Sequence, residues 1–540
     1  MVFADFSTVP PGSASTERKS AFRTFLRRYR VPLLATAPTL PLYAVWAAFL
    51  ATGGGDLAAQ QAWARFAAEH GASAYSLFWY GGMHTANYSL ISPYLMAAVG
   101  VRTVTVLSGI AGAWLVAALI ERTGVRRPLW PAVLASLGVW CNVASGRTTF
   151  ALGTAFAFAA CLALVRERRA VLASVCAALA TMGSPVAGLF LLVAGAGYLL
   201  VRDVGRAAAL AVPPVAVVAV TTLLFPFDGE QLMPFDRIFP PVLFGLALVL
   251  AAPREWRVLR LGAGVYAAGT VLTYLVPSPI GTNVERLAEL VGPAVLLAAL
   301  LVPGRDLLRR AALAVALVLC SGWLVQKTYD DLVVSTKVPG WAADTRGVVR
   351  ALERLGADRT RVEVVPARNH REATALAPYV HMARGWNRQL DIRRGRLFYD
   401  GTFSAATYRA WLDRWAVGYV VLPAGKPDGF AEQEAELVAS GPAWLKPVWG
   451  DGHWRVFRVR EPVPLVSAPA SVVRTTGSDV VVRVPERGSV TVRLVYSPWL
   501  RARGACLRRQ GEFTRLSVPA PGTYRITSGY GPSPRPSACR

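Results

Sequence analysis

Asp56 stands in the stretch GGGD, directly after an apolar run at residues 31–52 that is long enough to cross a membrane. A carboxylate at a bilayer surface suits general-base chemistry, in which it takes the proton from an attacking hydroxyl group. The sequence after Asp56, DLAAQQAW, is also typical of a first helical turn, where an acidic residue often caps the helix. Both interpretations of Asp56, catalysis and capping, stay open at this point.

Two arginines accompany other apolar runs: Arg147 in SGRTTF and Arg286 in GTNVERL. The guanidinium group presents a fork of donors that fits a phosphate, so both are candidates for binding an anionic phosphate. The alternative is that their side chains extend to the membrane interface. No acidic pair adjoins Asp56, and Glu69 fits a solvated position. The sequence therefore leaves any metal requirement unknown.

Aromatic residues and a histidine follow Asp56 and are candidates for lining a pocket: Trp79, Tyr80, His84 and Tyr88. Aromatic rings stack on sugars or lipids, and a histidine can contact an acceptor or a phosphate. An aromatic belt at the membrane interface predicts the same aromatic residues. His84 is equally compatible with a hydrogen-bonded structural role.

The composition indicates which kind of secondary structure holds these residues in place. The chain has 540 residues, of which 54% are hydrophobic and 17% are charged, and this profile is typical of a polytopic membrane protein. We expect eleven transmembrane helices near residues 31–52, 102–121, 129–145, 148–165, 170–185, 186–201, 207–225, 237–252, 260–276, 287–303 and 308–325.

The formal net charge is +25, and its placement indicates topology. Five alternate connections hold fourteen arginines: Arg122, Arg126, Arg127, Arg166, Arg168, Arg169, Arg202, Arg206, Arg254, Arg257, Arg260, Arg305, Arg309 and Arg310. The opposite connections hold only Arg65, Arg102, Arg147, Arg237 and Arg286. The positive-inside rule then places residues 1–30 in the cytoplasm and the C-terminal region outside, and no nucleic-acid partner is needed to explain the charge.

The loop at residues 53–101 is expected to be external. Its apolar segment at residues 88–101 is too short for a regular crossing, so we expect it to lie along the surface. The segment at 56–70 has an amphipathic helical pattern and is expected to lie there too.

After residue 325 the composition becomes polar. Residues 326–464 mix helical and strand-like patterns and predict an α/β domain, whereas residues 465–540 alternate at period two and predict a small β-sandwich. Trp386, Trp411 and Trp415 suit a carbohydrate face, but packing in the domain core is the favoured interpretation. Cys506 and Cys539 are the only cysteines beyond the last span, and we expect them to form a disulfide in an oxidising compartment.

This order of features resembles the GT-C superfamily of membrane glycosyltransferases, in which an acidic residue follows the first helix and a long external loop precedes many further spans. The resemblance covers residues 31 to about 325 and rests on architecture and on Asp56. It implies transfer of a sugar from a polyprenyl-phosphate donor to a cell-envelope glycan, lipid or protein, with Asp56 as base. It implies no cofactor beyond that donor.

Two other classes stay open. A transporter of a lipid or envelope precursor is compatible with the helix-breaking GSP at 183–185, and an inactive GT-C-like scaffold for envelope assembly is compatible with the same architecture. A Walker loop and a nucleophile elbow are absent from the sequence, which argues against those enzyme classes.

Overall fold

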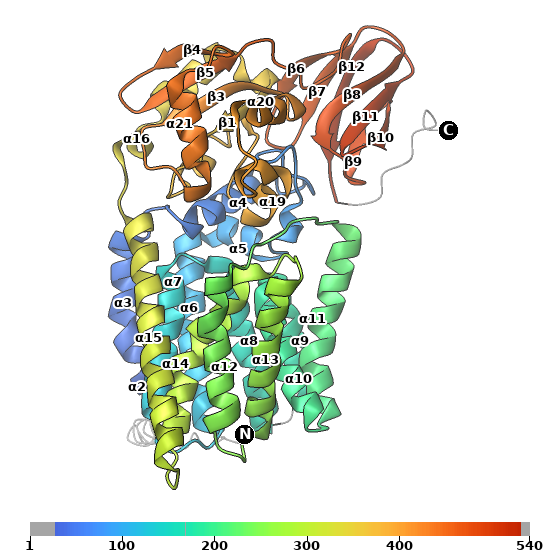
Figure 1. Cartoon of the computed structure of the whole chain (residues 1–540). Coiled ribbons are helices and arrows are strands. Elements are labelled where there is room, and N and C mark those ends of the chain that lie inside the picture. Colours follow the sequence, from blue (N-terminus) through green and yellow to red (C-terminus); the bar gives the residue numbers. More distant parts are fainter. Residues whose placement is uncertain (1–27, 168, 531–540) are drawn as a thin grey trace, which may run out of the picture.

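The computed structural model describes residues 28–167 and 169–530. A bundle of long helices forms one half of the molecule, and a region of sheets and short helices covers one end of that bundle (Figure 1). The described chain begins at the end of the bundle away from the sheets and finishes in the sheet region.

The first apolar run folds as consecutive short helical pieces: α2 (Arg30–Thr36), η1 (Ala37–Thr39), α3 (Leu40–Val45) and η2 (Trp46–Leu50). Pro38 and Pro41 begin two of these pieces. Because proline lacks a backbone N–H and its ring clashes with the preceding turn, it interrupts regular helical bonding. The run still spans 21 residues.

Ten further helices complete the bundle in the described chain: α6 (Val101–Arg122), α7 (Leu129–Ala144), α8 (Thr148–Glu167), α9 (Ala170–Gly183), α10 (Pro185–Leu200), α11 (Val204–Leu224), α12 (Phe239–Ala251), α13 (Arg257–Leu275), α14 (Arg286–Leu300) and α15 (Leu307–Thr336). The short turns η4 (Phe235–Ile238) and η5 (Gly281–Glu285) precede α12 and α14.

Each predicted span therefore coincides with helical structure. Within the described residues, six spans, including the first run, are long and apolar enough to cross a membrane, and three further apolar helices are shorter. The chain is a membrane protein, and the total of eleven crossings stays a prediction.

Helix α15 differs from the sequence prediction. The last span was expected to end at residue 325, but the helix continues to Thr336 and has 30 residues. The stretch QKTYDDLVVST is more polar than a membrane span, yet it contains no glycine or proline that would stop a helix. Its extra turns carry Lys327 and Asp331 to the end of the bundle that the sheets cover.

Two surface helices lie between the bundle and the sheets: α4 (Asp56–His70) and α5 (Ser92–Val99), with η3 (Thr85–Asn87) between them (Figure 1). Helix α5 has eight residues and is too short to cross a bilayer, as predicted. Trp63 and Phe66 of α4 share a buried core with Val362 and Met382 of the sheet region. This shared core fixes the loop after Asp56 against the sheets.

The first part of the sheet region is the predicted α/β unit. Its elements are α16 (Gly340–Ala343), α17 (Arg346–Arg354), η6 (Ala357–Arg359), β1 (Arg361–Val364), α18 (Glu372–Ala375), β2 (His381–Met382), α19 (Arg388–Arg394), η7 (Arg396–Phe398), α20 (Ala405–Arg414), β3 (Val417–Pro423), η8 (Gly429–Ala431), α21 (Glu432–Ser440), β4 (Leu445–Gly450) and β5 (Trp454–Val459). The strand order is β2-β1-β3-β5-β4. Strands β2, β1 and β3 are parallel, and β3, β5 and β4 are antiparallel.

The second part is an antiparallel β-sandwich, as the period-two pattern predicted. Its strands are β6 (Ser471–Thr475), β7 (Val480–Val484), β8 (Gly488–Val495), β9 (Leu500–Ala502), β10 (Cys506–Gln510), β11 (Phe513–Val518) and β12 (Gly522–Ser528). The sheet β10-β11-β8 faces the sheet β6-β7-β12-β9 across a core rich in valine. Cys506 is buried in β10, but Cys539 lies outside the described residues, so the disulfide stays a prediction.

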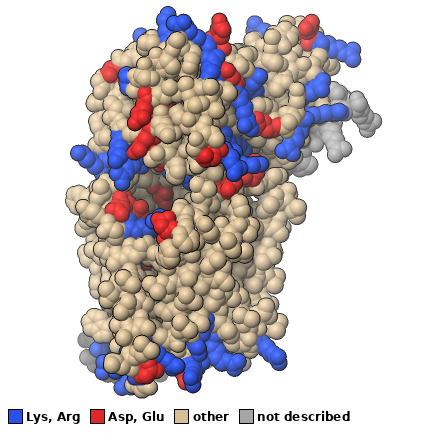
Figure 2. Space-filling view, viewed as in Figure 1, with Lys and Arg blue, Asp and Glu red and all other residues tan. Residues whose placement is uncertain are grey.

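Charged side chains are distributed along the bundle as a membrane protein requires. Figure 2 shows an uncharged zone across the visible face of the bundle and a mostly basic band of side chains at the end away from the sheets. That end holds the connections that are rich in arginine, such as the turn between α12 and α13. The distribution fits the predicted orientation, which stays a prediction.

Candidate active site

Asp56 is the first residue of α4, at the end of the bundle that the sheets cover. The residue before it, Gly55, has φ +63° and ψ −138°, a conformation that is essentially restricted to glycine. Gly55 is the N-cap residue, and no side chain makes a capping hydrogen bond at this helix terminus. The Asp56 side chain is 32% exposed, so its carboxylate is accessible rather than engaged as a cap.

The structure brings the three charged residues predicted for the site together. Arg147 places Nε 3.5 Å from Oδ2 of Asp56, and Arg286 places Nη2 3.9 Å from the same oxygen. Arg147 lies in the turn between α7 and α8, and Arg286 begins α14. Three residues that are distant in sequence therefore meet because each stands at the same end of its helix.

Two further carboxylates, which the sequence did not indicate, surround Arg147. Its Nη1 donates to Oε2 of Glu289 at 2.6 Å, and its Nη2 donates to Oδ2 of Asp331 at 3.1 Å. Glu289 reaches Arg147 because α14 packs closely on α7: a Cβ added at Gly138 would lie 2.6 Å from the carbonyl oxygen of Leu290. Asp56, Glu289 and Asp331 thus converge on one guanidinium group.

A signal for these residues was present in the sequence. Glu289 stands in the apolar stretch RLAELVGPAVLLAAL, where a charge is costly and marks a functional or paired position. Lys327 and Asp331 are one helical turn apart in α15, and so they point to the same side of that helix. The predicted end of the last span at residue 325 concealed them.

The charge cluster extends sideways from Glu289. Nζ of Lys327 contacts Glu289 and lies 2.5 Å from Oε2 of Glu285, while Nε of Arg237 lies 3.1 Å from Oε1 of Glu285. The cluster thus alternates positive and negative side chains between α14, α15 and η4. Figure 2 shows acidic and basic side chains gathered in a hollow at the boundary between the bundle and the sheets.

A small pocket adjoins the charged residues. It is lined by Asn142, Ser145, Arg147, Arg286, Glu289 and Thr328, among others. Neither side-chain amide atom of Asn142 has a hydrogen-bond partner in the part of the chain that the structure describes. The pocket thus offers polar groups beside the two arginines.

Tyr88 is the predicted pocket residue whose pKa is affected by Asp56. Its hydroxyl accepts a hydrogen bond from Nε2 of Gln60 at 2.5 Å, and its ring stacks on Trp63 with centroids 5.9 Å apart. Burial raises the pKa of Tyr88, and the negative charge of Asp56 raises it further. Tyr88 is thus a neutral hydroxyl group within electrostatic range of Asp56.

Trp79, Tyr80 and His84 are buried where the loop meets the sheets. The indole N–H of Trp79 donates to the carbonyl of Ala373 at 3.2 Å, and the Tyr80 hydroxyl donates to the carbonyl of Asn387 at 3.2 Å. These contacts are typical of core residues, and a role of the three side chains in a pocket stays a prediction.

His84 makes contacts of a structural kind. Its Nδ1 donates to the carbonyl of Ala74 at 2.9 Å, and its Nε2 lies 3.1 Å from Oγ of Ser497 in the sandwich. Burial lowers the pKa of His84 to about 4. A neutral imidazole with both nitrogens occupied connects the loop at residues 53–101 to the sandwich.

The tryptophans of the α/β unit separate into two groups. Trp411 and Trp415 are buried in the core, as the favoured interpretation held. Trp386 instead extends toward α4, and its Nε1 donates to the carbonyl of Gly55 at 3.0 Å. This contact with the residue before Asp56 had no signal in the sequence, because 331 positions separate the two residues.

Within residues 28–167 and 169–530, no group of three or more His, Cys, Asp or Glu side chains is arranged to hold a metal ion. The carboxylates of Asp56, Glu289 and Asp331 instead share the guanidinium group of Arg147.

No family model and no curated protein matches the chain. Among solved structures, it is similar to mycobacterial arabinofuranosyltransferase AftD, with a TM-score of 0.43, 15% identity, and coverage of 85% of this chain and 41% of AftD. A mutant form of AftD gives a TM-score of 0.45, 16% identity, and coverage of 80% and 42%.

AftD is a membrane glycosyltransferase of the GT-C superfamily, the superfamily that the sequence resembles. This chain spans less than half of the length of AftD. Similarity at this level concerns the course of the fold and assigns no residue, substrate or partner to this chain.

Proposed function

We propose that the protein is a GT-C-type glycosyltransferase that moves a sugar from a polyprenyl-phosphate donor to an acceptor of the cell envelope. The observation that carries the proposal is the meeting of Asp56 with Arg147 and Arg286 where the apolar bundle ends. A donor with a lipid tail and a phosphate head needs such a boundary, because its tail requires the bilayer and its phosphate requires cations. The acceptor is an envelope glycan, lipid or protein.

In the proposed reaction, a carboxylate oxygen of Asp56 takes the proton of the acceptor hydroxyl as the hydroxyl oxygen attacks the anomeric carbon. The bond between that carbon and the phosphate oxygen breaks, and its electron pair leaves with the phosphate. Tyr88 lies beside Asp56 as a neutral polar group at the edge of the reacting centre. The 32% exposure of Asp56 supports this role, since a base must reach its substrate.

We propose different roles for Arg147 and Arg286. Arg147 contacts three carboxylates, Asp56, Glu289 and Asp331, and therefore has little donor capacity left for a phosphate. Among the described residues, the only ion pair of Arg286 is a weak one with Asp56, and its guanidinium lies over the ring of Phe150 at 5.4 Å. We assign Arg286 as the main phosphate contact and Arg147 as the residue that fixes Asp56 and supports phosphate binding.

The orientation proposed from the sequence places residues 1–30 in the cytoplasm and the sheet region outside the cell membrane. The basic band at the opposite end of the bundle supports it (Figure 2). The position of the charged site also favours transfer over transport, since a transporter binds its substrate near the middle of the membrane. Here Asp56, Arg147 and Arg286 all stand at helix ends.

The substitution Asp56→Asn tests the proposal. It removes the base, keeps the side-chain size, and should lower kcat for transfer from a polyprenyl-phosphate sugar by about 10²–10⁴-fold. Glu69→Gln is the matched control, because Glu69 lies on the same helix and pairs only with the exposed Arg65. The purified variants are compared in detergent or liposomes after size exclusion has verified folding. Equal activity of folded Asp56→Asn and wild-type protein would remove Asp56 from the mechanism.

A further inference from the structure

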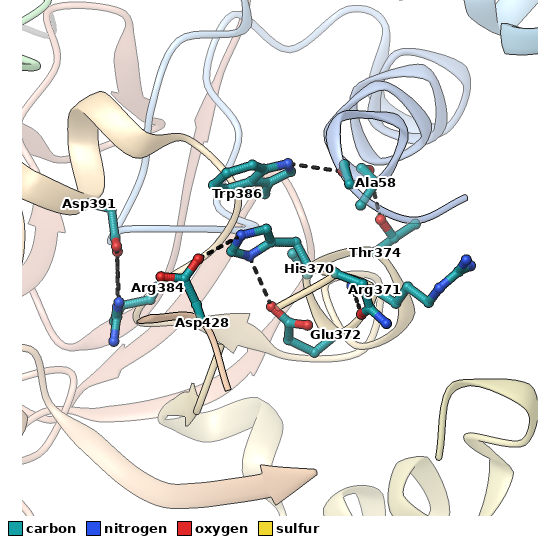
Figure 3. Close-up of polar contacts among 12 residues, drawn as sticks. Ala58, His370, Arg371, Glu372, Thr374, Arg384, Trp386, Asp391 and Asp428 are labelled. Atoms are coloured by element: carbon teal, nitrogen blue, oxygen red, sulfur yellow. Dashed lines mark hydrogen bonds and ion pairs between the residues drawn. The ribbon is translucent and has the colours of Figure 1, made fainter. Parts of the chain in front are cut away.

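A segment of the α/β unit holds the peptide that precedes the proposed base. The N–H of Gly55 donates to the carbonyl of Asn369 at 2.8 Å, and the carbonyl of Gly55 accepts from Nε1 of Trp386 at 3.0 Å. Both polar groups of Gly55 therefore bond to this segment, and the Gly55 carbonyl also accepts the N–H of Ala58 at 3.0 Å within α4. One turn further along α4, Oγ1 of Thr374 donates to the carbonyl of Ala58 at 2.7 Å (Figure 3).

The position of the Asp56 carboxylate depends on this peptide. Gly55 has a conformation that only glycine adopts readily, and Asp56 follows it as the first residue of α4. A rotation of the Gly55 peptide would redirect the Cα–Cβ bond of Asp56 relative to Arg147 and Arg286, which are fixed on other helices. The hydrogen bonds of the Gly55 peptide thus act together on the direction of the carboxylate, and that of Trp386 is the one made by a side chain.

The indole that makes this bond is itself held in place. The imidazole of His370 stacks on Trp386 with ring centroids 3.5 Å apart and an interplanar angle of 14°. Nε2 of His370 lies 3.1 Å from Oδ2 of Asp428, and Nη2 of Arg388 donates to the same oxygen at 2.7 Å. Arg388 also lies 5.0 Å from the Trp386 ring centroid. Figure 3 shows the stacked rings between Asp428 and the start of α4.

We propose that Trp386 is a positioning residue for the reaction: its indole N–H fixes the Gly55 carbonyl and thereby aims the Asp56 carboxylate at the acceptor hydroxyl. The inference rests on the proposed function of Asp56. The α/β unit is then part of the catalytic apparatus of the bundle, through its hydrogen bonds to Gly55 and Ala58, and does more than recognise an acceptor. His370, Arg388 and Asp428 support the indole.

The substitution Trp386→Phe removes the N–H and keeps an aromatic ring for His370 to stack on. We expect kcat to fall by about 10–100-fold, since a small displacement of a reacting group has effects of this size. The KM for donor should stay within about twofold of wild type. Trp454→Phe is the matched control, because Nε1 of Trp454 donates to the carbonyl of Trp341 at 3.0 Å in the core of the same unit, away from Gly55.

A double substitution separates this inference from the proposed function. If Trp386 acts through Asp56, the protein with both Asp56→Asn and Trp386→Phe should be no less active than Asp56→Asn alone. Multiplied losses, an increase in KM alone, or a kcat of Trp386→Phe equal to that of Trp454→Phe would overturn the positioning role. Full activity of Asp56→Asn would instead reject the proposed function itself.

A milder variant covers the case in which Trp386→Phe does not accumulate as folded protein. Thr374→Val removes the hydrogen bond to Ala58 and leaves the buried rings unchanged. We expect a smaller loss of kcat, about threefold to tenfold, again without a change in KM. Unchanged kcat in folded Thr374→Val, with Trp386→Phe unfolded, would count against positioning by this segment.

Discussion

Two arginines in this protein each face three carboxylates, one at the membrane boundary and one inside the α/β unit. Arg147 meets Asp56, Glu289 and Asp331, whereas Arg384 meets Asp391, Glu434 and Glu363. The chemical groups are the same. What differs is access: Asp56 and Asp331 are 32% and 36% exposed, and the carboxylates around Arg384 are nearly or fully buried.

The enclosed cluster has the geometry of a structural network. Arg384 donates in a bidentate fashion to Asp391, with both distances 2.9 Å, and Nη1 donates to Glu434 at 2.8 Å. Its guanidinium also lies 3.9 Å from the ring centroid of Phe398. Burial raises the pKa of Glu363 well above its usual range, and the neighbouring Glu434 raises it further. No face of this cluster is left for a substrate.

The cluster around Arg147 differs from the cluster around Arg384 in its exposure. Arg147 is tied to Glu289 in the bundle, but its other partners, Asp56 and Asp331, reach the hollow between the bundle and the sheets. An arginine surrounded by acids is therefore no sign of a catalytic site by itself. Exposure of two of the three partners, Asp56 and Asp331, is the feature that distinguishes the proposed site.

The substitution Arg384→Met should have the largest effect on stability and would test the structural side of this comparison. It leaves buried carboxylates without their cation, which costs about 3–5 kcal/mol. We expect loss of the folded α/β unit or a large fall in its melting temperature, measured by thermal unfolding and limited proteolysis. Arg346→Met is the control, since that arginine is exposed, pairs with exposed Asp344, and should leave the melting temperature nearly unchanged. Similar stability of both variants would contradict the structural role.

The substitution Arg286→Ala should have the next largest effect, and it tests the accessible cluster at the membrane boundary. Removing a charge-assisted bond to the donor phosphate costs about 1.5–3 kcal/mol, and kcat/KM for donor should fall about 10–100-fold. Melting temperature should change little, in contrast to Arg384→Met. Arg65→Ala provides the control, because Arg65 is exposed on α4 and pairs with Glu69. An unchanged kcat/KM in Arg286→Ala would withdraw the phosphate contact.

Much of the architecture was predictable because it follows from one-dimensional patterns. Apolar runs located the helices, and period-two alternation located the sandwich. Asp56, Arg147 and Arg286 were also predictable, since each stands at the same membrane surface and helix ends at one surface converge. This argument uses helix orientation alone and needs no knowledge of which helices are neighbours.

The remaining parts of the site depend on packing between helices and domains. Glu289 meets Arg147 only because α7 and α14 pack closely at Gly138, and Trp386 meets Gly55 only because the sheet unit rests on α4. Asp331 was missed for a different reason, since a change in composition at residue 325 was interpreted as the end of a helix that continues to Thr336. Composition indicates where a bilayer ends, whereas a helix ends where a residue stops it.

Two histidines of the α/β unit are both buried but differ in their partners, and pH should reveal that difference. His381 is buried in β2, and its Nε2 donates to the carbonyl of Thr476 at 2.6 Å. Burial lowers the pKa of His381 to about 4. Burial alone would also lower the pKa of His370, but the neighbouring carboxylates of Asp428 and Glu372 outweigh that effect and leave the pKa raised.

The two shifts have opposite consequences for stability, and they give the smallest of the expected effects. The unfolded chain takes up a proton near pH 6.5 that folded His381 refuses until about pH 4, so acidification to pH 5.5 should cost about 1 kcal/mol at this residue. His370 binds its proton more tightly when folded, so its contribution is complete below about pH 6.5 and is lost as pH rises through its raised pKa. His381→Gln should therefore reduce the loss of melting temperature between pH 7.5 and pH 5.5, and His370→Gln should increase it. An equal change in melting temperature between pH 7.5 and pH 5.5 in the two variants would show that the histidines do not differ in protonation.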